Sequence, residues 1–124
     1  MRLIVSANIS QVERYKSPTG QEHVRVEYPD GQVQIYEGPK GAERKVRAQY
    51  PDGQEQHYEG PKGEERIVRI VGAEGDVEHY EGQAPDERKV RVVYPDGRVE
   101  HYEGPDGQER KVRVEYPDGR VEKY

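Results

Sequence analysis

Apolar and polar residues alternate along this chain in short runs that Pro and Gly interrupt. Residues 111–116, Lys-Val-Arg-Val-Glu-Tyr, alternate with a period of two, and residues 120–124 do the same. Such alternation predicts strands, and no run has the 3.6-residue spacing of an amphipathic helix. Between the two runs stands Tyr-Pro-Asp-Gly-Arg, whose Pro and Gly favour a hairpin turn with a glycine bulge. The sequence therefore predicts β-hairpins.

The hairpin pattern is a tandem repeat with a period of 22 residues. A repeat of this length is typical of an array in which each unit packs mainly against its neighbours. The third copy departs most, because Gly72 replaces the turn tyrosine. Two rows of the repeat are Val24, Val46, Val68, Val90 and Val112, and Tyr36, Tyr58, Tyr80 and Tyr102.

The N-terminal residues diverge from this pattern. A strand over residues 3–5, a turn and a returning strand over residues 9–15 are expected there. The returning strand matches the later copies, but the match is one residue short before Val24. We therefore predict a divergent N-terminal capping hairpin at residues 1–23, then tandem 22-residue β-hairpin repeats at residues 24–124, in a single domain overall.

Counting outward from a turn predicts which residues face each other. Tyr94 opposite Arg98 places Arg91 opposite His101. If the following loop makes a second, regular hairpin, each row gains a neighbour on its other side. These predicted neighbours are Val90 and Val112 on either side of Tyr102, and Lys89 and Lys111 on either side of Glu103.

This register predicts an all-β fold, in which tandem β-hairpin repeats form an elongated, twisted, single-layer antiparallel sheet. The alternative is a β-solenoid with 22-residue coils. A solenoid stacks equivalent residues about 4.8 Å apart, which would place the repeated arginines in one column of like charge. The antiparallel sheet separates them by a strand and is therefore favoured. The sequence leaves open whether that sheet stays open, curls or closes.

Composition indicates a thin protein. Only 31% of the residues are hydrophobic and 36% are charged, so apolar side chains are too few for a two-layer core. The net charge of −5 argues against a nucleic-acid partner, because phosphate binding needs surplus Lys and Arg. Cysteine is absent, which excludes disulfides and thiol chemistry. Neither a membrane span nor a secretory signal is expected, so a soluble, cytoplasmic protein is the default, with the compartment unknown.

Candidate catalytic and metal-binding residues are few. His57, His79 and His101 recur at one position and could form a metal row, but arginine neighbours repel a cation and equivalent histidines lie about 10 Å apart. The acidic loops offer fewer carboxylates than calcium needs. A flat layer has no cleft in which carboxylates are desolvated. We therefore predict no catalytic, cofactor-binding or metal-binding residues, no cofactor and no enzymatic activity.

The tyrosines are the best candidates for an interaction face, because tyrosine offers a large contact area and a hydroxyl at little entropic cost. The same rings could instead only cover Val and Arg stems within the sheet. Either the Tyr/Val face or the sheet edges could bind a protein partner or a second copy. The candidate face comprises Tyr36, Tyr58, Tyr80, Tyr102, Tyr50, Tyr94 and Tyr116.

Tyr-Pro-Asp-Gly followed by Tyr-Glu-Gly resembles the MORN repeat, a β-hairpin module of similar length, over residues 28–124. The chain departs from the MORN pattern at residues 109–113, where Glu-Arg-Lys-Val-Arg replaces a Gly-x-Gly step. The resemblance implies a non-catalytic scaffold, or a MORN-like module that binds a protein or membrane surface. Uniform copies and near-ideal turns also suit a designed or consensus repeat protein.

We therefore expect a non-enzymatic structural repeat scaffold, natural or engineered, with no dedicated small-molecule site. The alternative is a protein- or membrane-surface interaction module that uses the Tyr/Val face.

Overall fold

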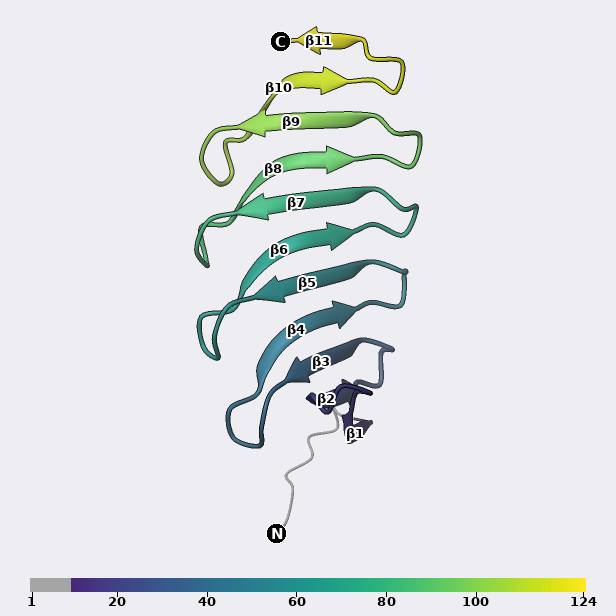
Figure 1. The fold of residues 1–124 in the computed structure, drawn as a ribbon, viewed down its shortest axis with the longest axis vertical. Helices are drawn as coiled ribbons and strands as arrows, with labels where there is room; N and C mark the ends of the chain where they lie inside the picture. The colour runs from purple at the N-terminus through teal and green to yellow at the C-terminus, as the bar shows by residue number, and fades with distance from the viewer. Residues whose placement is uncertain (1–9) are drawn as a thin grey trace.

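The computed structural model describes residues 10–124 as one open sheet of eleven antiparallel strands, in which each strand pairs with its neighbours in sequence (Figure 1). The predicted single-layer hairpin sheet is confirmed, and the solenoid alternative is wrong. The strands are β1 (Gln11–Lys16), β2 (Glu22–Glu27), β3 (Val33–Glu37), β4 (Arg44–Gln49), β5 (Glu55–Glu59), β6 (Arg66–Val71), β7 (Val77–Glu81), β8 (Arg88–Val93), β9 (Val99–Glu103), β10 (Arg110–Glu115) and β11 (Val121–Lys123).

The sheet is elongated and twisted, with β1 and β11 at its opposite ends (Figure 1). Strands β3 to β11 form a ladder, whereas β1 and β2 are turned out of its plane in this view. Such rotation between successive strands is the ordinary twist of a sheet of L-residues. The strand expected over residues 9–15 is found as β1, and the one expected over residues 3–5 lies outside the described residues.

The turns that begin with Tyr-Pro-Asp-Gly form the hairpins that the sequence predicts. The amide of Tyr94 donates to the Arg98 carbonyl at 2.9 Å, and Gly97 donates back to the Tyr94 carbonyl at 2.9 Å. Gly97 has a φ of 93°, which a side chain would strain. The Asp96 carboxylate accepts from the Arg98 amide at 2.9 Å. The predicted pairing of Arg91 with His101 follows from this turn and is confirmed.

The second type of hairpin contains a β-bulge that the sequence analysis did not predict. Lys111 pairs with Tyr102 and Arg113 pairs with His101, so Val112 is an extra residue on β10. The predicted placement of Tyr102 opposite Val112 is therefore wrong. The cause is that two residues of the bulged strand oppose one residue of its partner, which simple counting does not allow for.

The bulge also changes the charged neighbours. Glu103 pairs with Arg110 and not with Lys111, and Lys89 pairs with Tyr80 on β7. The predicted placement of Glu103 beside Lys111 is wrong for the same reason. On the other side, the ladder between β8 and β9 ends at Arg91 and His101. The placements of Tyr102 opposite Val90 and of Glu103 opposite Lys89 therefore stay predictions. Strands β4, β6 and β8 carry the same irregularity. Each bulge places a lysine, or in the third copy an isoleucine, beside a tyrosine.

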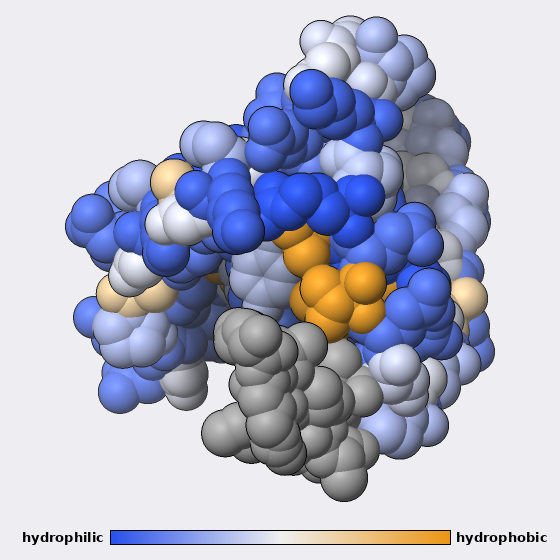
Figure 2. All heavy atoms as spheres, turned by 90° about the horizontal axis from the view of Figure 1, so that it is seen from below, coloured by the Kyte–Doolittle hydropathy of each residue, from blue (hydrophilic) through white to orange (hydrophobic). Residues whose placement is uncertain are grey.

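Few side chains are buried, because no second layer covers either face of the described sheet. The buried apolar residues lie within the sheet itself, and one carboxylate, Glu100, is buried with them at 7% exposure. Seen from its N-terminal end, the surface is mainly hydrophilic, with a small apolar group inside the curve (Figure 2). The buried apolar residues are Val33, Ile35, Ala48, Val92 and Val114.

Successive turns also touch each other, and this contact is testable at one glycine. A Cβ at Gly97 would lie 3.0 Å from Cγ of Pro117 in the next turn, whereas at Gly107 it would meet nothing within 4 Å. Both glycines have positive φ, so either alanine is expected to cost about 1–2 kcal/mol of unfolding free energy. Gly97→Ala is expected to cost more than Gly107→Ala in urea denaturation. Equal losses would show that turn packing contributes nothing.

Candidate functional site

The predicted tyrosine positions lie on one face of the sheet, where their hydroxyls converge on a row of acceptors. In the fourth copy, Tyr94 and Tyr102 both donate to Oε1 of Glu100, at 2.7 and 2.9 Å. Lys111 adds an ion pair to the other Glu100 oxygen at 3.2 Å. This carboxylate, although buried, is therefore fully engaged by three donors, as a buried charge must be.

Other copies repeat the arrangement with glutamine or glutamate as the acceptor. The third copy has one tyrosine donor, Tyr80, because Gly72 replaces the other. The equivalent bonds run from Tyr36 to Gln34 at 2.8 Å, Tyr50 to Gln56 at 3.1 Å, Tyr58 to Gln56 at 2.6 Å, Tyr80 to Glu78 at 2.9 Å, and Tyr116 to Glu122.

The lysines beside the bulges cover the tyrosine rings. Lys89 pairs with Tyr80 on one side, and its ammonium lies 4.6 Å from the ring centre of Tyr102 on the other. Lys45 lies 4.5 Å from the ring centre of Tyr58. Each such cation–π contact is worth about 0.5–1 kcal/mol at an exposed site. Tyrosine and lysine thus alternate across the strands and support each other.

Burial and hydrogen bonds on this face shift the pKa values of Tyr102 and Glu100 away from neutral pH. Burial, together with the hydrogen bond to Glu100, raises the pKa of the Tyr102 hydroxyl. Burial acts to raise the pKa of Glu100 too, but hydrogen bonds from Tyr94, Tyr102 and Lys111 outweigh it and hold that pKa below its ordinary value. The tyrosines therefore stay neutral donors, and Glu100 stays an ionised acceptor.

A second set of glutamates links successive copies at the other hairpin ends. Glu65 accepts from the amide of Gly63 in its own loop at 2.8 Å, and from the amide of Lys45, on β4, at 3.0 Å. The Lys45 amide is the main cause that lowers the pKa of Glu65. Glu87 bonds Ile67 in the same way at 2.9 Å. Each bond spans 20 residues, so it joins one repeat to the next.

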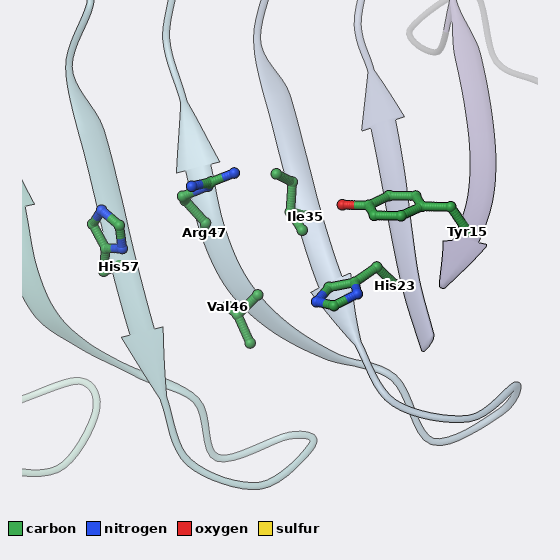
Figure 3. Close-up of a pocket in the computed structure, with 6 residues that line it drawn as sticks. All are labelled: Tyr15, His23, Ile35, Val46, Arg47 and His57. Atoms are coloured by element: carbon green, nitrogen blue, oxygen red, sulfur yellow. The ribbon is translucent and has the colours of Figure 1, made fainter. Parts of the chain in front are cut away.

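The opposite face carries a row of alternating arginine and histidine. Arg69 pairs with His57 on β5 and with His79 on β7. Burial lowers the pKa of His79, and Arg91 and Arg69 lower it further. Within residues 10–124, no group of three or more metal-binding side chains is close enough to hold an ion. At the N-terminal end this face contains a hollow, and Tyr15 and His23 line one side of it (Figure 3).

Sequence reasoning found the tyrosines but missed their acceptors. The signal was present in the sequence, because a Gln or Glu recurs with the same 22-residue spacing. It stands two positions before each tyrosine of the row Tyr36, Tyr58, Tyr80 and Tyr102. Because residues two apart in a strand share a face, these side chains had to lie beside the rings. Nothing in the structure tests the candidate interaction face as a binding surface, so that assignment stays a prediction.

Glu100 provides a direct test of the acceptor row. Glu100→Ala is expected to lower the free energy of unfolding by about 1–3 kcal/mol, because it leaves buried donors without a partner. Glu100→Gln is expected to cost less, since Gln34 and Gln56 accept the same bonds in other copies. Urea denaturation measures both. A loss with Glu100→Ala no greater than with Glu103→Ala, an exposed position on the same strand, would contradict this role.

No protein-family model, curated protein or solved structure matches this chain. The MORN-like resemblance therefore stays a prediction.

Proposed function

We propose that this chain is a non-enzymatic structural repeat scaffold. The observation that carries the proposal is that the tyrosine hydroxyls are used within the sheet. The two donors to Glu100 illustrate it, since their hydroxyls and the carboxylate satisfy each other. The Tyr94 hydroxyl bonds across the hairpin to β9, the Tyr102 hydroxyl bonds within β9, and the Tyr102 ring contacts Lys89 of β8. Groups that a binding face would offer to a partner are therefore used within the sheet.

The titration of the repeated groups supports the absence of enzymatic activity. A general acid or base works best with a pKa near the working pH. Here burial raises the pKa of Tyr80 away from neutrality, while backbone amide bonds lower that of Glu109. Burial also lowers the pKa of His79, so the imidazole is neutral at pH 7. The Tyr80 hydroxyl and the Glu109 carboxylate are therefore not poised for proton transfer near neutral pH.

A protein- or membrane-surface interaction module remains the second candidate function. It is favoured by the half-buried rings of Tyr58 and Tyr80, which no second layer of the described chain covers. Among residues 10–124, no helix is long and apolar enough to cross a membrane.

The two functions differ in what a double substitution on the tyrosine face would do. For a scaffold, Tyr58→Ser with Tyr80→Ser is expected to lower the free energy of unfolding by about 2 kcal/mol or more. The reason is that two hydrogen bonds, the contact of Lys45 with the Tyr58 ring and the cross-strand pair of Tyr80 with Lys89 are lost. Cosedimentation with phosphatidylcholine–phosphatidylserine vesicles, and the molar mass in analytical ultracentrifugation, are expected to match those of wild type.

The control is His57→Ser with His79→Ser, which alters the neighbouring positions on the opposite face of the same strands. Vesicle binding or dimerisation by the wild type that the tyrosine variant loses and the histidine variant keeps would contradict the scaffold proposal. That result would establish the interaction module.

A further inference from the structure

The hollow on the arginine–histidine face departs from the repeated pattern of the sheet. It lies where β1 and β2 turn out of the plane of the other strands (Figure 1) and encloses about 260 Å³ (Figure 3). Its side chains come from five successive strands. They are Tyr15, His23, Ile35, Val46, Arg47 and His57.

The first departure from the repeat is the side on which Tyr15 lies. Tyr102, its counterpart, pairs with Lys111 beside a bulge and lies on the tyrosine face. The chain between Tyr15 and Val24 is one residue shorter than in the later copies, and β2 pairs with β1 without a bulge. Because a shift of one residue moves a strand's side chains to the other face, Tyr15 lies on the arginine–histidine face. There it stacks on His23, with ring centres 5.2 Å apart and planes at 12°.

The second departure is the floor of the hollow. Ile35 occupies the repeat position that histidine occupies in the next three copies, and it is 6% exposed. It pairs with Arg25 on one side and with Arg47 on the other. The bulge on β4 turns Val46 toward the same hollow. The floor and one wall are therefore apolar, between two guanidinium groups.

The charges around the hollow leave one cation uncompensated. Glu37 is held by Arg44 at 2.9 Å and by His23 at 3.6 Å. Glu55 lies 3.3 Å from His57. In contrast, Arg47 has no ion pair with any carboxylate of the described chain, and its Nε is buried without a hydrogen-bond partner.

Two further groups, one guanidinium and one imidazole, complete the surroundings. Arg25, the other guanidinium beside Ile35, is paired with Glu27 at 3.2 Å. Burial lowers the pKa of His57, and Arg69 lowers it further, so this imidazole is neutral at pH 7. The free positive charge at the hollow is therefore that of Arg47.

We propose that this hollow binds a small aromatic carboxylate, with the ring against Ile35 and Tyr15 and the carboxylate on the Arg47 guanidinium. The planar fork of arginine matches a carboxylate in a bidentate pair. The volume of about 260 Å³ is below the roughly 300–1,000 Å³ of sites for drug-sized ligands, which suits a single-ring compound. This activity goes beyond the proposed scaffold function, because it belongs to the N-terminal end of the sheet, where Tyr15 and Ile35 depart from the repeat.

Benzoate is the probe, and the ¹H–¹³C NMR signal of the Ile35 methyl groups reports on the floor of the hollow. Saturable shifts of this signal are expected with benzoate. Acetate keeps the charge without the ring, and benzyl alcohol keeps the ring without the charge. Both are expected to bind at least about tenfold more weakly, since a charge-assisted pair or the ring contact is lost in each.

The repeat provides a matched control for the arginine. Arg47→Gln is expected to weaken benzoate binding by about tenfold or more. Arg91→Gln changes the equivalent row position, which also pairs with a histidine, and is expected to leave the affinity unchanged. Ile35→His introduces the residue that three other copies already accommodate and is expected to remove the ring contact and the binding. Because this variant lacks the Ile35 signal, its binding is followed at the methyl groups of Val46, which also lines the hollow.

Three results would overturn the proposal. The first is no Ile35 shift at millimolar benzoate. The second is an equal affinity for acetate and benzoate, which would indicate only a diffuse attraction to the arginine row. The third is equal weakening by Arg47→Gln and Arg91→Gln.

Discussion

The structure depends on the hydrogen bonds and ring contacts between side chains of adjacent strands. A single-layer sheet cannot bury enough apolar area to offset the loss of chain entropy. Its polar side chains must therefore stabilise it by contacts with each other. Tyrosine suits this role, because its ring packs against a lysine and its hydroxyl reaches an acceptor. Glu100 shows the result: it is 7% exposed, with three donors around it.

The same constraint explains why the hairpins differ at their two ends. At one end, Pro and Gly form tight turns that contact the turn of the next copy, as Gly97 does with Pro117. At the other end, a bulge brings each lysine to a tyrosine, and a loop glutamate such as Glu65 bonds an amide of the preceding repeat. Contacts therefore extend only to adjacent repeats, as in other linear arrays.

The strands and tight turns could be predicted from the sequence, because Pro, Gly and period-two alternation act locally. The bulges could not, since no residue type marks Val112 as an extra residue. With the bulges missed, the predicted neighbours of Tyr102 and Glu103 on β10 were also wrong. The hollow at Tyr15 depends on the residue missing before Val24, which the sequence shows, but its effect on the face of β1 follows only from the observed register.

The heat capacity change of unfolding, measured by differential scanning calorimetry, tests most directly whether side-chain pairing within one layer replaces a core. Ordinary globular proteins give about 12–15 cal/mol/K per residue, mainly because unfolding exposes buried apolar surface. We predict a value clearly below that range and independent of protein concentration. A value within the range, or one that rises with concentration, would show that a substantial apolar core forms and would contradict the account.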